Sequence, residues 1–274
     1  MTTLDDDRID LGAYFSRIGY SGSHEASVDT LAAIQARHMA CIPFENLDPL
    51  LGRPVRLDLP SLAHKLVHSR RGGYCFEQNL LFSHVIGRLG IEHIGLAARV
   101  LWNQPADEDR PRSHMLLLAT LDGVAYIADV GFGGHCPSAP LRLDSEAPQQ
   151  TPHGNYRLRR DGADYTLLIN IDNAWRPVYR FDLCPQLPVD YVAANYYLST
   201  SDDSHFRHGL YAALATPGER RALLGHRYTV RKDDGSSARR DLSDADEIAA
   251  VLREEFGIAV PDMACLRAVV AHGI

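Results

Sequence analysis

The sequence has no long uninterrupted apolar run and no excess of basic charge. None of its segments approaches the ~18 apolar residues that a membrane-spanning helix needs. Its 28 basic residues are outnumbered by 35 acidic ones, for a net charge of −7, and they form no basic stripe of the kind that binds nucleic acid or acidic membranes. The sequence therefore predicts neither a nucleic-acid partner nor a membrane partner.

Cysteine is also scarce, and its pattern excludes two classes of site. The five cysteines are odd in number, widely spaced and form no C-x-x-C pair, which indicates neither a disulfide framework nor a zinc site. His64 and His68 have the i, i+4 spacing of zinc ligands, but no third ligand accompanies them, so we expect a solvated helix face and no metal. The first ten residues are acidic and do not resemble a signal peptide. We therefore expect a cytoplasmic protein.

The pattern of apolar residues predicts an α+β fold. With 45% apolar and 23% charged residues, the composition is that of an ordinary globular protein, large enough for one domain or for two to three small ones. Periodicity near 3.6 predicts helices in the first third, over 11–18, 28–42, 60–68 and 75–89, with a loop at 43–47.

Composition changes at Ile91, where residues that favour strands become common. Strands with intervening turn signals are expected over 93–102, 113–121, 124–130, 156–159, 165–171 and 175–183. They predict a small β-barrel or sandwich. In the last third the sequence predicts a helix at 189–197, a hairpin at 227–240 and a helix at 244–256.

Arg70-Arg71-Gly72-Gly73-Tyr74-Cys75 directly precedes the helix expected at 75–89. The glycines allow a sharp or left-handed turn, which places Cys75 in the first helical turn. Unpaired amides and the helix dipole there favour a thiolate, and Arg70 and Arg71 could add to that field. Cys75 is thus a candidate nucleophile, and a buried structural cysteine is the alternative. Glu45, in the loop at 43–47, could pair with either arginine.

A candidate base and its acceptor lie on one hairpin. A turn centred on Asp122-Gly123 places Leu116 opposite Asp129, so His114 and Asp129 are diagonal neighbours on the same face. A cysteine nucleophile needs a base, and that base needs an acceptor that fixes its tautomer. Cys75, His114 and Asp129 supply the three roles, although the hairpin alone does not decide whether Cys75 reaches His114.

Four motifs give the chain a family resemblance: R-G-G-Y-C-F-E-Q-N at 71–79, P-F-E-N-L at 43–47, S-H-M at 113–115 and D-V-G-F-G-G at 129–134. In this order and spacing the chain resembles the arylamine N-acetyltransferases from about Tyr14 to Leu210. The resemblance implies an N-terminal helical bundle, a central β-barrel and a C-terminal α/β lid around a cysteine-protease-like Cys-His-Asp core. We place these parts at 1–90, 91–190 and 191–274.

The same resemblance implies a function and its site. The triad would be Cys75, His114 and Asp129, and the cysteine would take an acetyl group from acetyl-coenzyme A and pass it to an aromatic amine or hydrazine. Residues expected to line an apolar acceptor slot are Phe44, Val100, Phe132 and Phe206. Residues expected to contact coenzyme A are Trp102, Gly131, Phe132, Gly133 and Gly134. Without the resemblance, core packing and a strand-ending turn would account for these two sets.

Three other functions use similar residues. A papain-like or transglutaminase-like hydrolase has the same triad, but it has no need for the P-F-E-N and G-F-G-G motifs and is expected with a secretory signal and a pro-segment. An amide-forming biosynthetic enzyme would use the same triad with a larger acyl group. A non-catalytic binding module would require the triad to be incidental.

Overall fold

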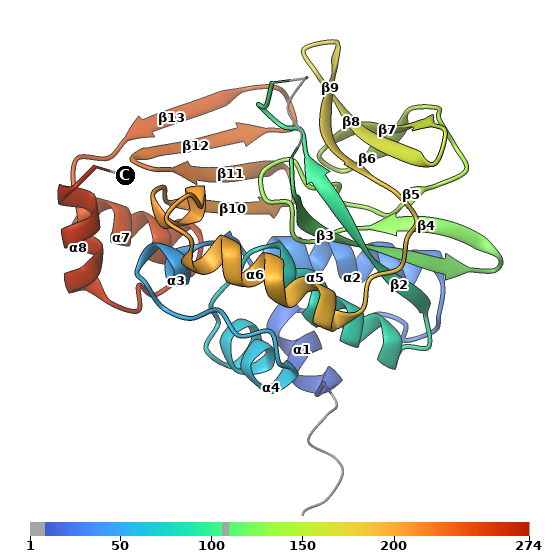
Figure 1. The fold of residues 1–274 in the computed structure, drawn as a ribbon, viewed down its shortest axis with the longest axis horizontal. Helices are drawn as coiled ribbons and strands as arrows, with labels where there is room; N and C mark the ends of the chain where they lie inside the picture. The colour runs from blue at the N-terminus through green and yellow to red at the C-terminus, as the bar shows by residue number, and fades with distance from the viewer. Residues whose placement is uncertain (1–8, 106–109, 274) are drawn as a thin grey trace, which may run out of the picture.

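The computed structural model describes residues 9–105 and 110–273, which form a layer of helices beneath two sheets (Figure 1). The first helices begin at side chains that accept hydrogen bonds from free backbone amides: Asp10 caps α1 and Ser27 caps α2. The helices of the first third are α1 (Leu11–Ile18), α2 (Val28–Cys41), α3 (Leu47–Leu50), α4 (Leu59–Leu62) with the π-helical turn η1 (Ala63–His68), and α5 (Cys75–Arg88).

Eight strands of the described chain form one antiparallel sheet in the order β5-β4-β3-β2-β9-β8-β7-β6. Their inward-facing residues, which include Leu96, Leu116, Tyr156 and Tyr179, form one apolar core. The strands are β2 (Glu92–Val100), β3 (Arg112–Leu121), β4 (Val124–Ala128), β5 (Leu141–Arg142), β6 (Gln149–Thr151), β7 (Gly154–Asp161), β8 (Asp164–Ile171) and β9 (Ala174–Phe181).

The two edges of this sheet meet through one side chain. The Gln149 side chain of β6 accepts a hydrogen bond from the Arg142 amide at 2.8 Å and donates one to the Arg142 carbonyl at 2.9 Å. The sheet is thus a nearly closed barrel, and the predicted α+β fold class is confirmed.

A second sheet has the order β1-β10-β11-β12-β13 within the described residues. Its strands are β1 (Phe44–Glu45), β10 (Tyr211–Thr216), β11 (Glu219–Leu224), β12 (Arg227–Lys232) and β13 (Ser237–Asp241). The accompanying helices are η2 (Pro188–Asp190), α6 (Tyr191–Thr200), η3 (His205–Arg207), α7 (Ala245–Glu255) and α8 (Met263–Ala271). The hairpin and the helix expected at 227–240 and 244–256 are confirmed as β12, β13 and α7.

The loop expected at 43–47 is wrong. Phe44 and Glu45 form a strand that pairs with Ala213 and Ala212 of β10, and α3 begins at Leu47. The partner strand lies far along the chain, so no local pattern indicates it. The second sheet therefore contains residues from both halves of the sequence, and the part boundaries at residues 90 and 190 stay a prediction. In residues 9–105 and 110–273 no helix has the length and apolar character needed to cross a membrane.

Candidate active site

Cys75 is the first residue of α5, and the segment before it is tightly enclosed. A Cβ on Gly72 would lie 2.0 Å from the Pro43 carbonyl oxygen, and one on Gly73 would lie 2.6 Å from Glu77 Oε2. Neither glycine has a left-handed φ angle, so both are needed for close approach. This enclosure fixes the position from which the Cys75 side chain leaves the backbone.

A buried cluster of charges holds this segment from behind. We call Glu45, Asp48, Lys65, Arg71 and Glu77 the ion-pair cluster. Arg71 Nε donates to Glu45 Oε1 at 2.8 Å, which confirms the expected pairing with Glu45. Lys65 Nζ lies 2.6 Å from both Asp48 Oδ2 and Glu77 Oε1.

The ion-pair cluster reaches the start of α5 through one carboxylate. Glu77 Oε2 accepts a hydrogen bond from the Tyr74 amide at 3.1 Å. Burial raises the pKa of Glu77 to about 7 even though Lys65 acts in the opposite direction. Arg71 makes its hydrogen bonds to Glu45 and Asp48, and Arg70 is exposed. The structure therefore gives no support to the expected contribution of these arginines at the thiol.

His114 and Asp129 form a buried pair at the end of the β3–β4 hairpin. The observed register, with Leu117 opposite Ala128, agrees with the predicted one, and His114 Nε2 lies 2.8 Å from Asp129 Oδ2. Burial by itself would lower the pKa of His114, but the Asp129 carboxylate outweighs it and the pKa rises to about 10. Burial raises the pKa of Asp129, yet the charge of His114 and hydrogen bonds bring it below its usual value.

Two polar side chains hold Asp129 in place. Asn79 Nδ2 donates to Asp129 Oδ1 at 3.0 Å and to the Met115 carbonyl at 2.8 Å, while Gln35 Nε2 donates to the Asp129 carbonyl at 3.2 Å. Asn79 lies one helical turn after Cys75, so α5 carries both the thiol and a partner of Asp129. Sequence reasoning missed both residues, because their complete burial and their partners are seen only in the structure.

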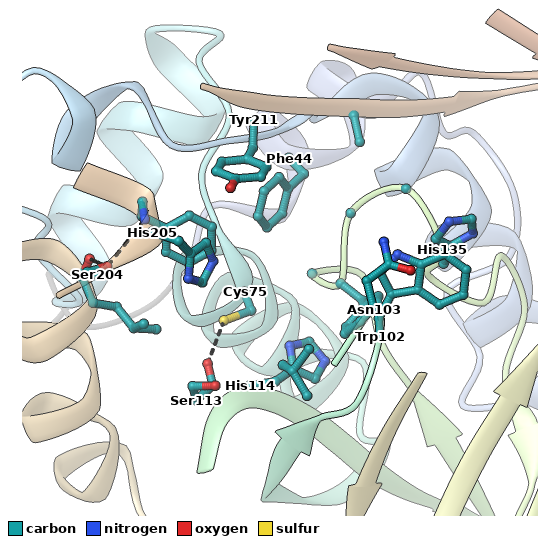
Figure 2. Close-up of a pocket in the computed structure, with 18 of the residues that line it drawn as sticks. Phe44, Cys75, Trp102, Asn103, Ser113, His114, His135, Ser204, His205 and Tyr211 are labelled. Carbon is teal, nitrogen blue, oxygen red and sulfur yellow. Dashed lines mark hydrogen bonds between the residues drawn. The ribbon is translucent and has the colours of Figure 1, made fainter. Parts of the chain in front are cut away.

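The Cys75 side chain lies beside His114. Its Sγ is 3.6 Å from the Ser113 carbonyl oxygen (Figure 2), and an electrostatic interaction with Cys75 also contributes to the raised pKa of His114. The helix start and the hairpin therefore bring together Cys75, His114 and Asp129. A thiol beside a histidine that favours its protonated form can transfer its proton to that ring.

These residues open into a cavity of about 760 Å³. Cys75 and His114 line it, and Asp129 lies behind His114. All residues expected to contact the acceptor or coenzyme A also line it: Phe44, Val100, Trp102, Gly131, Phe132, Gly133, Gly134 and Phe206.

Sequence reasoning missed several residues on the cavity wall. His135 lies with its ring centroid 4.0 Å from that of Trp102, and Tyr211 stands 5.7 Å from Phe206 (Figure 2). The wall also includes Tyr197 and His205. Among the residues described, no group of three His, Cys, Asp or Glu side chains could hold a metal ion.

Comparisons with known proteins agree on one family. A family model described as N-acetyltransferase matches residues 27–264. The arylamine N-acetyltransferase of Escherichia coli is 44% identical to this chain over 92% of the chain and 90% of the relative. The solved arylamine N-acetyltransferase of M. tuberculosis has a TM-score of 0.91 at 40% identity, covering 95% of this chain and 99% of that one.

A further solved relative carries a ligand. The arylamine N-acetyltransferase of Mycobacterium marinum, determined in complex with CoA, has a TM-score of 0.91 at 37% identity and covers 95% of this chain and 98% of that one. The matching family model and the identity over nearly the whole chain are sufficient to assign the family. The chain therefore belongs to the arylamine N-acetyltransferase family of acyltransferase enzymes.

Proposed function

We propose that this enzyme transfers an acetyl group from acetyl-coenzyme A to Cys75 and then to an arylamine, arylhydrazine or hydrazide. The observation that carries the proposal is the buried His114–Asp129 pair beside Cys75 at the wall of one aromatic-lined cavity. The relative solved with CoA supports coenzyme A as the carrier of the acetyl group.

In the first half-reaction the Cys75 thiolate attacks the thioester carbonyl carbon. Cys75 is the first residue of α5, and no hydrogen bond within the described residues occupies its backbone amide, so this amide can donate to the developing oxyanion. The bond to the coenzyme A sulfur then breaks, the leaving thiolate takes a proton from His114, and an acetyl-cysteine thioester remains. The two thioesters are similar in energy, so this intermediate is not a deep trap.

In the second half-reaction the nitrogen of the acceptor attacks the acetyl-cysteine. His114 accepts the proton that the nitrogen loses, and the Cys75 thiolate leaves, which restores the starting state. Phe44, Phe206 and Tyr211 supply an apolar wall for an aromatic acceptor. We also propose a cytoplasmic location, because all five cysteines are free thiols.

The test uses radiolabelled acetyl-coenzyme A without an acceptor. We expect one label per chain to stay on Cys75 after denaturation, and addition of aniline to release it as acetanilide. The Cys75→Ser variant is the control and should take up no label, since the serine hydroxyl stays protonated near neutral pH and is a far weaker nucleophile than a thiolate. Equal labelling of that variant, or an unlabelled wild type, would contradict the covalent mechanism. Rapid loss of label to water would favour the hydrolase, and stronger labelling by larger acyl thioesters the amide-forming enzyme.

A further inference from the structure

We call residues 131–136 the glycine loop. Most of its backbone carbonyls have hydrogen-bond partners within the described residues, whereas several of its amides have none there. The Gly133 carbonyl accepts from the Cys136 amide at 3.1 Å, and the Gly134 carbonyl accepts from Arg220. The His135 and Cys136 carbonyls both accept from the Tyr156 hydroxyl at 3.1 Å. Each carbonyl from 133 to 136 is therefore bonded to the protein.

Three consecutive amides of the glycine loop differ from these carbonyls. Within the described part of the chain, no hydrogen bond occupies the amides of Gly133, Gly134 and His135, and all three residues line the cavity. Gly133 has a left-handed φ of 82°, and a Cβ on Gly134 would meet no atom within 4 Å. Consecutive free amides around a left-handed residue bind anions.

Arg220 of β11 holds the loop in this state. Its Nη1 donates to the Gly134 carbonyl, and its Nη2 donates to the Cys136 carbonyl at 3.0 Å and to the Tyr156 hydroxyl at 2.9 Å. Tyr156 belongs to β7, so the loop is fixed between the barrel and the second sheet.

Among the described residues, no carboxylate neutralises the charge of Arg220. No carboxylate of the described residues lies within ion-pair distance of Arg220 or of Arg231, its cross-strand neighbour on β12. Burial lowers the pKa of His135 to about 4, and the positive charges of Arg220 and Arg231 contribute to this shift. Both charges therefore act at the glycine loop, where an anionic group of a ligand would be favoured.

We propose that Arg220 is a positioning residue for the acyl donor: it holds the glycine loop with its amides free to bind the donor's phosphates. The inference rests on the proposed function, because it takes acetyl-coenzyme A as the donor. Arg220 touches the loop and not the reacting atoms, so it acts on donor binding and leaves the chemistry at Cys75 unchanged.

The test compares two acetyl donors with one acceptor. Acetyl-coenzyme A carries phosphates, and p-nitrophenyl acetate carries none. For Arg220→Gln we expect the KM for acetyl-coenzyme A to rise about tenfold, the size expected for a lost charge-assisted hydrogen bond, while kcat/KM for p-nitrophenyl acetate stays within about twofold. Arg221→Gln is the matched control, because Arg221 is the next residue on the same strand and pairs with Glu219 and Glu255. It should alter neither donor's kinetics.

A second variant distinguishes the bidentate hydrogen bonding of the guanidinium from the effect of its positive charge. Arg220→Lys keeps the charge but cannot bridge two carbonyls, so its KM for acetyl-coenzyme A should lie between those of wild type and Arg220→Gln. Wild-type kinetics in Arg220→Lys, an equal loss with both donors, or no change in Arg220→Gln would each overturn the proposal. The proposed function fails separately, when the wild type itself takes no acetyl label from acetyl-coenzyme A.

Discussion

Gly131 lies directly against the backbone of Cys75: a Cβ on Gly131 would fall 2.7 Å from Cys75 Cα and 2.6 Å from Asn79 Nδ2. Real Cβ atoms do not approach other heavy atoms this closely, so only glycine fits at the point where the glycine loop contacts α5. The glycine thus sets how near the cavity wall comes to the thiol.

Gly131→Ala should therefore damage both the fold and the site. Because the added methyl group meets backbone on α5, we expect the free energy of unfolding to fall by about 1 to 3 kcal/mol, with a loss of kcat. Urea unfolding measures the first effect. Gly134→Ala is the control: its Cβ would meet no atom within 4 Å, so its unfolding free energy should stay within about 0.5 kcal/mol of wild type. Equal stability of the two variants would contradict this account.

Asp129→Asn should preserve the fold and strongly reduce the acetyltransferase activity. The amide has no charge with which to hold the protonated His114 ring, and it can favour the wrong tautomer. We expect kcat to fall by a factor on the order of 10³ to 10⁴ and the alkylation of Cys75 by iodoacetamide at pH 7 to slow. Asp122→Asn, at the exposed turn of the same hairpin, should leave both rates unchanged. An unchanged alkylation rate in Asp129→Asn would leave that residue a structural role only.

Two buried histidines should limit stability at opposite ends of the pH range. Burial lowers the pKa of His38 to about 4, so its neutral ring contributes stability above pH 6.5 that is lost as pH falls from 6.5 to about 4. His114, with its pKa raised to about 10, contributes stability below pH 6.5 that is lost as pH rises from 6.5 to about 10.

Urea unfolding between pH 4 and pH 10 measures the free energy of unfolding and checks the loss of stability at both acid and alkaline pH. His38 Nε2 donates to Gln78 Oε1 at 2.6 Å, and Nδ1 accepts from the Tyr14 hydroxyl at 2.7 Å, so the ring is held neutral. His38→Gln should reduce the pH dependence of the unfolding free energy below pH 6.5 by up to about 1.4 kcal/mol per pH unit. Asp129→Asn should reduce the pH dependence above pH 6.5. If the unfolding free energy of both variants depends on pH as it does in the wild type, groups other than these histidines cause the pH dependence.

Lys65→Met should cost far more stability than an ordinary lysine substitution. Asp48 and Glu77 would lose a buried partner 2.6 Å away, and breaking a buried ion pair costs about 3 to 5 kcal/mol. Arg53→Met removes another cation from Asp48, at 3.2 Å, but that side chain is 51% exposed, and we expect a loss below about 1 kcal/mol. Chemical denaturation of the two variants makes the comparison, and similar losses would show that the ion-pair cluster is not a stabilising unit.

Initial rates should show parallel lines when one substrate is varied at several fixed levels of the other. In the proposed mechanism one cavity serves both half-reactions, so coenzyme A would leave before the acceptor reacts. Anilines, arylhydrazines and hydrazides should be good acceptors because their nitrogen is unprotonated at pH 7 and an aromatic ring suits the wall. Alkylamines should be poor. Intersecting lines, or alkylamines that react faster than anilines, would point to a ternary complex or to an amide-forming enzyme.

The sequence predicts those features that depend on neighbouring residues. The Asp122-Gly123 turn sets the register that joins His114 to Asp129, and the helix start places Cys75. The walls of the cavity at Phe44, Val100 and Phe206 came from the family resemblance alone, because their contacts join distant segments. Asn79 and Arg220 were missed for the same reason: their partners lie on strands and loops whose docking one sequence does not reveal.

The pairing of Phe44 with Ala213 has a consequence for how the enzyme forms during synthesis. Cys75, His114 and Asp129 all precede residue 130, so they are synthesised early. One wall of the cavity nevertheless includes Tyr211, Ala222 and Leu224, which leave the ribosome much later. Contacts of such long sequence separation form slowly. A nascent chain therefore contains all three of these residues before the strands that complete this wall have been synthesised.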